Sequence, residues 1–72
     1  MSFKTLRNAK KIKQSDISIK LEVSQSTVAA WETGKAYPRP DKLLKLEKLL
    51  GVPAGDIIRA ISEAAEERSK EY

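Results

Sequence analysis

Residues 14–35 read "QSDISIKLEVSQSTVAAWETGK" and contain two short helical patterns with only about three residues between them. In the first pattern, Ile17 and Leu21 are four residues apart and fall on one helical face. In the second, Val28 and Trp31 share a face in the same way. Two helices joined by so short a turn must cross steeply. The second helix therefore packs its Val28 and Trp31 face against the first and turns its opposite face outward.

The outward face of the second helix is short and uncharged, and it carries Gln25, Ser26, Ala29 and Ala30. A helix that enters the major groove of DNA cannot carry bulky side chains along its outer face. Gln25 can pair with adenine through N6 and N7, the serine hydroxyl can donate or accept, and the alanines can meet thymine methyl groups. The alanines are also simply good helix formers. The stretch predicts a helix-turn-helix whose second helix leads into the groove with its N-terminal residues.

Helical periodicity continues through the chain and predicts an all-α fold, a compact bundle of about five short helices. Ser2, Ser24 and Pro40 suit the starts of the first, third and fourth helices, and Gly34 suits the end of the third. The side chains expected in the core outside the quoted stretch are Phe3, Leu6, Leu43, Leu44, Leu46, Leu49, Leu50, Ile57, Ile58 and Ile61. Residues 1–62 are expected to form the domain, and residues 63–72 a charged extension of the last helix.

The composition excludes several classes of function. The chain has 72 residues, which fit one domain, and it contains no cysteine and no histidine. Disulfides, zinc sites and the usual histidine base are therefore excluded. We expect no enzyme activity, no cofactor, no metal and no small-molecule ligand. No apolar run is long enough for a membrane span or a signal peptide, so we expect a cytoplasmic protein without membrane contact.

The positive charge is concentrated in the first half of the chain, which has a formal net charge of +4 as a whole. Residues 1–36 hold seven basic and three acidic residues, whereas residues 37–72 hold seven of each. This asymmetry suggests a polyanionic partner for the first half. A solvated basic surface would explain the charge alone equally well.

Residues 3–61 resemble the xenobiotic-response-element class of helix-turn-helix proteins, the class of phage repressors and Cro proteins. The matching positions in residues 14–35 are Gln14, Ser18, Leu21, Val23, Ser24, Val28, Trp31, Glu32 and Gly34. Residues 40–52, "PDKLLKLEKLLGV", resemble the fourth helix of that family and the turn after it. The resemblance implies a partner, double-stranded DNA, and a homodimer.

The resemblance also implies roles for individual residues. The positions that match base-contacting ones are Gln25, Ser26, Ala29, Ala30 and Thr33. The positions that match phosphate-contacting ones are Gln14, Ser24, Lys35, Tyr37 and Arg39, and Gln14 would also steady the first recognition residue. Arg7 and Glu32 resemble a structural ion pair between the first helix and the end of the third.

Alternatives remain for three of the residues singled out. Trp31 could stack on a base, although its spacing from Val28 favours the core. Arg7 could bind phosphate instead of pairing with Glu32. Tyr37 could contact phosphate, a second subunit or its own loop.

The sequence departs from the family pattern at two turns. Glu22 stands where the family usually has glycine after the second helix, and Lys11 stands at a similar position after the first. If the turns keep their usual shape, Glu22 adopts a left-handed conformation at some cost. Ile19 stands where a charged residue is common, as an exposed apolar side chain that a partner could contact.

Together these features predict a sequence-specific regulator of transcription that binds double-stranded DNA. We expect a repressor that acts as a dimer on a pseudo-palindromic operator. The alternative is a protein-interaction module on the same scaffold, such as an antitoxin or an adaptor. The neutral outer face flanked by lysines favours the regulator, since an acidic recognition helix would favour the module.

Overall fold

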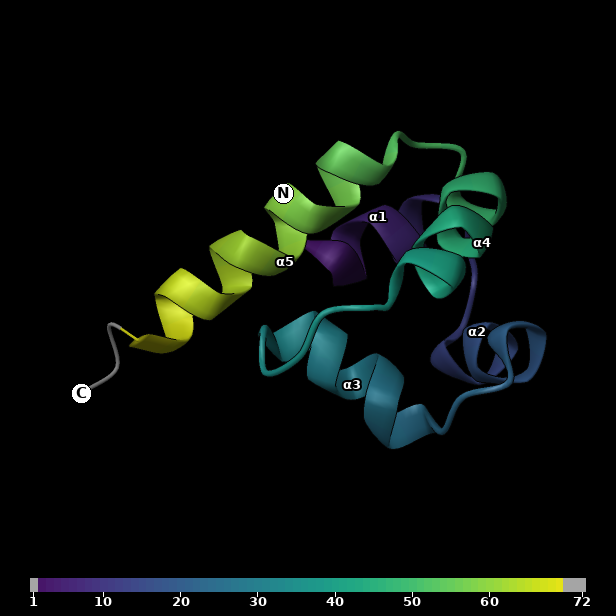
Figure 1. Cartoon of the computed structure of the whole chain (residues 1–72), viewed down its shortest axis with the longest axis horizontal. Helices are drawn as coiled ribbons and strands as arrows, with labels where there is room; N and C mark the ends of the chain where they lie inside the picture. Colours follow the sequence, from purple (N-terminus) through teal and green to yellow (C-terminus); the bar gives the residue numbers. More distant parts are fainter. Residues whose placement is uncertain (1, 70–72) are drawn as a thin grey trace.

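The computed structural model describes residues 2–69, and this part of the chain contains five helices and no strand. The helices are α1 (Phe3–Ala9), α2 (Gln14–Leu21), α3 (Gln25–Thr33), α4 (Pro40–Leu50) and α5 (Ala54–Ser69). In Figure 1, α1 to α4 form the body of the molecule with the start of α5, and the end of α5 projects beyond them. The predicted all-α bundle is confirmed. Residues 70–72 of the expected extension lie outside the described residues.

The ends of the helices follow from local chemistry. Ser2 and Ser24 each accept a hydrogen bond from the backbone N–H three residues further on, which caps α1 and α3. Pro40 begins α4, where its fixed φ and missing N–H suit the first turn. Gly34 ends α3 with a φ of 79°, in the left-handed region. These boundaries were predicted from the sequence and are confirmed.

The core surrounds Trp31, which is 2% exposed and meets Phe3 edge to face with ring centroids 6.2 Å apart. The other members of the core cluster are Ile17, Leu21, Val28, Leu46, Leu50, Ile57 and Ile61. Every helix contributes to this cluster, and α3 contributes Val28 and Trp31. Trp31 is therefore a core residue, and it does not face a ligand.

The apolar face of α4 is narrower than the sequence analysis expected. Leu46 and Leu50 are fully buried, and Leu43 and Leu49 are partly buried. Leu44 is 60% exposed, so its assignment to the core is wrong. Leu44 is two residues before the buried Leu46, so it points about 200° away around the helix, toward the opposite side.

Two charged side chains join neighbouring helices by bonding to backbone groups at helix ends that lack a partner within their own helix. Lys42 Nζ on α4 donates to the backbone oxygen of Leu21, the last residue of α2, at 2.7 Å. Glu47 Oε2 on α4 accepts from the backbone N–H of Ala54, the first residue of α5, at 2.8 Å. Each bond satisfies a backbone group that its own helix leaves unpaired. Helix α4 is thereby fixed to both α2 and α5.

Helix α5 passes very close to the end of α3. A Cβ atom built on Gly34 would lie 2.6 Å from Cα and 2.8 Å from Cβ of Ala65, and closer still to the Ala65 nitrogen. Such separations are far below van der Waals contact, so only glycine fits here. Residues 63–69, expected as a charged extension, thus continue α5 and pack through Ala65 on the helix-turn-helix.

Candidate nucleic-acid interface

Helix α3 presents an outer face of small and neutral side chains. Gln25 and Ser26, in its first turn, are exposed, whereas Ala29 and Ala30 are half-buried. The first turn contains no acidic residue, so the partial positive charge of the helix N-terminus is not neutralised there. Gln25 has no hydrogen-bond partner among residues 2–69, which leaves its amide free to bond outside the protein. This face has the size and polarity that contact with base edges requires.

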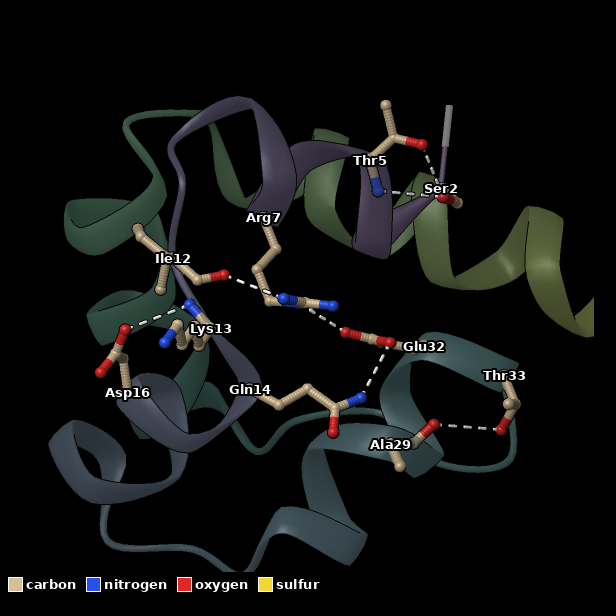
Figure 2. A network of polar contacts seen from close by, with 10 residues as sticks. All are labelled: Ser2, Thr5, Arg7, Ile12, Lys13, Gln14, Asp16, Ala29, Glu32 and Thr33. Atoms are coloured by element: carbon tan, nitrogen blue, oxygen red, sulfur yellow. Dashed lines mark hydrogen bonds and ion pairs between the residues drawn. The ribbon is translucent and has the colours of Figure 1, made fainter.

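A buried polar network holds the inner side of α3. Arg7 Nε donates to Glu32 Oε2 at 2.7 Å, and the two side chains are only 11% and 10% exposed. Arg7 Nη1 donates to the backbone oxygen of Ile12 at 2.9 Å, and Gln14 Nε2 donates to Glu32 Oε1 at 3.0 Å. We call these four residues the Glu32 network, and Figure 2 shows them converging between α1, α2 and α3. Both carboxylate oxygens have donors, so the charge of Glu32 is well compensated.

The position of Gln14 differs in one respect from the role implied by the resemblance. Its side chain bonds to Glu32 on α3, and within the described residues it makes no hydrogen bond to Gln25. An amide nitrogen carries two donors, and the bond to Glu32 uses one of them. Gln14 therefore helps to position α3 from the inside, and one N–H remains for a phosphate oxygen.

The two turns that lack the usual glycine keep a left-handed conformation. Lys11 has a φ of 57° and Glu22 a φ of 56°. Residues with a Cβ atom pay roughly 1–2 kcal/mol for this region. Glu22 ends α2, and its backbone N–H bonds to Ile19, which closes the short turn before α3. The expected left-handed Glu22 is confirmed, and α2 and α3 pack on each other without glycine in this turn.

Two of the predicted contact residues use their hydroxyl groups within the protein. Ser24 Oγ accepts from the Thr27 N–H at 3.1 Å and shares a hydrogen bond with Thr27 Oγ1. Thr33 Oγ1 donates to the backbone oxygens of Ala29 and Ala30 at 3.2 and 3.3 Å. Their remaining lone pairs can accept hydrogen bonds from a ligand, but neither hydroxyl is wholly free.

The loop between α3 and α4 carries two exposed cations, and its tyrosine bonds to α5. Lys35 is exposed, and Arg39 is exposed at the N-cap of α4. Tyr37 Oη shares a hydrogen bond of 2.9 Å with Ser62 Oγ on α5, although 48% of the residue is exposed. Of the roles left open for Tyr37, this contact corresponds to loop packing.

Arg68 is a cation near this loop that the sequence reasoning missed. Lys35 and Arg68 line the same hollow, together with Glu67 and the end of α3. The packing of Ala65 on Gly34 places this end of α5 beside the loop. No local pattern could indicate this, because the two cations are far apart in the sequence.

Other kinds of site find no support in residues 2–69. This part of the chain contains no group of three or more acidic, histidine or cysteine side chains that could hold a metal ion. None of its helices is both long enough and apolar enough to cross a membrane.

Comparison with known proteins agrees with the geometry. A family model described as helix-turn-helix matches residues 3–57, from the start of α1 into α5. No curated protein and no solved structure matches the chain. The match covers most of the sequence and includes α2, α3 and the turn between them. The chain therefore belongs to the Cro/C1-type helix-turn-helix family, the xenobiotic-response-element class of DNA-binding transcription regulators.

Proposed function

We propose that this protein is a sequence-specific repressor of transcription that binds double-stranded DNA as a homodimer, with α3 in the major groove. The observation that carries the proposal is the outer face of α3. It is free of charge and bulk, and it begins with Gln25, whose exposed amide has no partner among the described residues. The Glu32 network supports the proposal because it fixes the orientation of this face before DNA binds. The proposed function involves no catalysis and no cofactor, and it is exercised in the cytoplasm.

Affinity would come from cations around α3. Lys35 and Arg39 are exposed on the loop that follows α3, and the first half of the chain carries the whole formal excess of positive charge. Contacts from such residues to phosphates fix the position of a protein on DNA, while base contacts determine the sequence. In the proposed arrangement, phosphate contacts come from the loop after α3, and base contacts come from the neutral outer face of α3.

A homodimer is proposed because one recognition helix covers only a few base pairs. Two-fold pairing would place two half-sites about one helical turn apart, roughly 34 Å. The proposed contacts are the loop around Pro38–Pro40 and the region from Val52 to Ile61. A hollow of about 410 Å³ there has Leu6, Val52 and Ala60 in its lining. Asp56, Arg59 and Glu63 also line it, and such alternating charges can complement themselves across a two-fold axis.

Footprinting on an operator selected from random duplex DNA tests the dimer. Two protected half-sites about one turn apart are expected, with a complex of two chains per site at saturation. A single protected half-site occupied by a monomer would contradict the dimer. Binding to random duplex DNA at low and high salt separates the regulator from an interaction module, because only the regulator shows strong, salt-dependent affinity.

Gln25→Ala tests base readout by α3. We expect it to weaken binding to the selected operator by about 1–3 kcal/mol and to relax the base preference at one position. The matched controls are Lys35→Ala and Arg39→Ala, which should weaken operator and random DNA alike and flatten the salt dependence. The readout is the ratio of operator affinity to random-DNA affinity. If Gln25→Ala lowers both affinities equally, Gln25 does not read a base.

A further inference from the structure

A groove between α2 and α4 combines an apolar floor with unpaired positive charge. Its volume is about 270 Å³, and its lining residues are Lys20, Leu21, Lys45, Lys48 and Leu49. We call it the lysine groove. The three lysines are exposed, and none of their ammonium groups has a hydrogen-bond or ion-pair partner among residues 2–69. No acidic side chain lines the groove. The lining of the groove therefore carries three positive charges and no negative one.

Leu44 adds apolar surface beside the lysine groove. It is 60% exposed, and it lies one helical turn before Lys48 on the same face of α4. By contrast, Lys42, on the same helix, uses its ammonium group to bond to the end of α2. On α4, Lys42 therefore has a structural role, whereas Lys45 and Lys48 are free within residues 2–69 and lie among leucines.

The lysine groove is lined by residues of α2 and α4, and no residue of α3 lines it. Helix α2 packs on both α3 and α4, and in Figure 1 it lies below α4 and to the right of α3. On the proposed function, DNA would lie against the outer face of α3. A ligand in the lysine groove would then contact α2 and α4 and leave that face of α3 free.

We propose that the lysine groove binds a short acidic amphipathic segment of a partner protein. Carboxylates of the segment would pair with Lys20, Lys45 and Lys48, and an aliphatic side chain would pack over the leucines. Charge complementarity selects an acidic ligand. The apolar floor favours a peptide over a second stretch of DNA, because a phosphate backbone offers charge but no aliphatic group. The regulator would in this way recruit, or be controlled by, another protein while α3 occupies its operator.

The first test is an NMR titration of the full chain with a synthetic twelve-residue helical peptide. The peptide carries leucines at i and i+4 and glutamates at the flanking positions, and a control peptide replaces the leucines by serine at the same net charge. We expect saturable shifts of the amide signals of Lys20, Lys45 and Leu49. The control peptide should bind about fivefold or more weakly, since it loses its apolar anchors. Equal binding of the two peptides, or shifts that do not cluster at the groove, would overturn the proposal.

The second test compares Lys48→Glu with Lys4→Glu, which change the net charge equally. Lys4 is exposed on α1 and does not line the lysine groove. Lys48→Glu should weaken peptide binding about five- to tenfold, and Lys4→Glu should have little effect. An equal loss in both variants would mean that the peptide senses only the net charge of the protein, and the proposal would fail.

Affinity for duplex DNA completes the comparison. It should be the same in Lys48→Glu and Lys4→Glu to within about twofold, because the proposed groove is not a DNA surface. If Lys48→Glu loses much more DNA affinity than Lys4→Glu, the groove belongs to the phosphate-binding surface and the proposal is wrong. Failure of the protein to bind DNA at all would instead contradict the proposed function and leave the peptide result standing.

Discussion

Glu32 and Gly34 are two residues apart near the end of α3, and they hold this helix by different physical means. Glu32 contributes a charged side chain that accepts hydrogen bonds from α1 and α2. Gly34 contributes the absence of a side chain, which allows α5 to approach its backbone at Ala65. The contact of Glu32 depends on the charge and hydrogen bonding of its carboxylate. The contact of Gly34 depends only on the absence of a Cβ atom. The difference matters because a mutation can break each of them without touching the outer face of α3.

The same distinction appears among the four left-handed residues of the described chain. Lys11 and Glu22 adopt this conformation with a side chain attached, while Gly34 and Gly51 occupy it as glycines. The conformation alone therefore does not require glycine in this protein. At Gly34 the neighbouring helix imposes the requirement. At Gly51 a Cβ atom would meet only the flexible end of Lys10, at 3.4 and 3.5 Å.

The largest effect is expected on removing one side of the ion pair in the Glu32 network. Arg7→Ala leaves a buried carboxylate without its cation, and Glu32→Ala leaves a buried guanidinium without its anion. Each should lower the free energy of unfolding by about 3–5 kcal/mol. For so small a domain this is a large share of a total that is commonly about 5–15 kcal/mol. Thermal melts without DNA measure it.

The melts also decide between the two roles considered for Arg7. If Arg7 is structural, both variants melt early and lose DNA binding because they unfold. Were both to melt like the wild type while Arg7→Ala alone lost DNA affinity, Arg7 would belong to the phosphate-contacting surface instead.

Gly34→Ala tests the steric contact. The added methyl group must displace the backbone of α5 at Ala65. The new alanine must also keep the positive φ of this position. Overpacking costs about 1–3 kcal/mol and the left-handed conformation about 1–2 kcal/mol, so a loss of roughly 2–5 kcal/mol in the free energy of unfolding is expected. Urea denaturation measures the loss. A near-neutral Gly34→Ala would show that α5 does not pack closely on α3.

Gly51→Ala is the matched control, because it changes φ in the same way without a backbone clash. It should cost only about 1 kcal/mol, since the strain is partly offset by the lower entropy of the unfolded alanine variant. The difference between Gly34→Ala and Gly51→Ala in urea denaturation isolates the contribution of the contact between α3 and α5. If both variants lost the same free energy of unfolding, the whole loss would come from the strain of a positive φ in alanine and not from the contact with α5.

The smallest effect is expected from adding glycine where the family usually has it. Glu22→Gly and Lys11→Gly should each raise the free energy of unfolding by less than about 1 kcal/mol, because relief of strain is partly offset by the flexibility of glycine. For a domain of this size, 1 kcal/mol shifts the melting temperature by roughly 4–8 °C. The two substitutions change the net charge in opposite directions. A stabilisation in one variant and a loss in the other would therefore point to charge and not to the backbone.

Most of the helix boundaries could be predicted from the sequence, because they depend on local chemistry. Ser2, Ser24 and Pro40 act within one turn of their own position, and so does Gly34 as the end of α3. The exposure of Leu44 was not predicted, because a run of leucines does not show how much of the apolar face of α4 the neighbouring helices cover. The covered part of that face depends on tertiary packing.

The contacts that position the candidate site were harder to predict. The bond from Gln14 to Glu32 and the bond from Lys42 to the end of α2 join residues whose polar side chains look solvated in the sequence. Ala65 carried no signal at all, because alanine in a charged helix indicates neither core nor contact. Only the close approach to Gly34 shows its importance. The outer face of α3, in contrast, could be located from spacing alone.

The two supports of α3 have a consequence for synthesis of the protein on the ribosome. Arg7 precedes Glu32 by 25 residues, so the polar support becomes available soon after α3 emerges. Ala65 is added well after Gly34, and until then the end of α3 lacks its second support. A nascent chain that contains α1 to α3 can therefore make the contacts of the Glu32 network while the end of α3 is still incompletely fixed. The end of α3 would therefore be fixed only after α5 has been synthesised and has packed on Gly34.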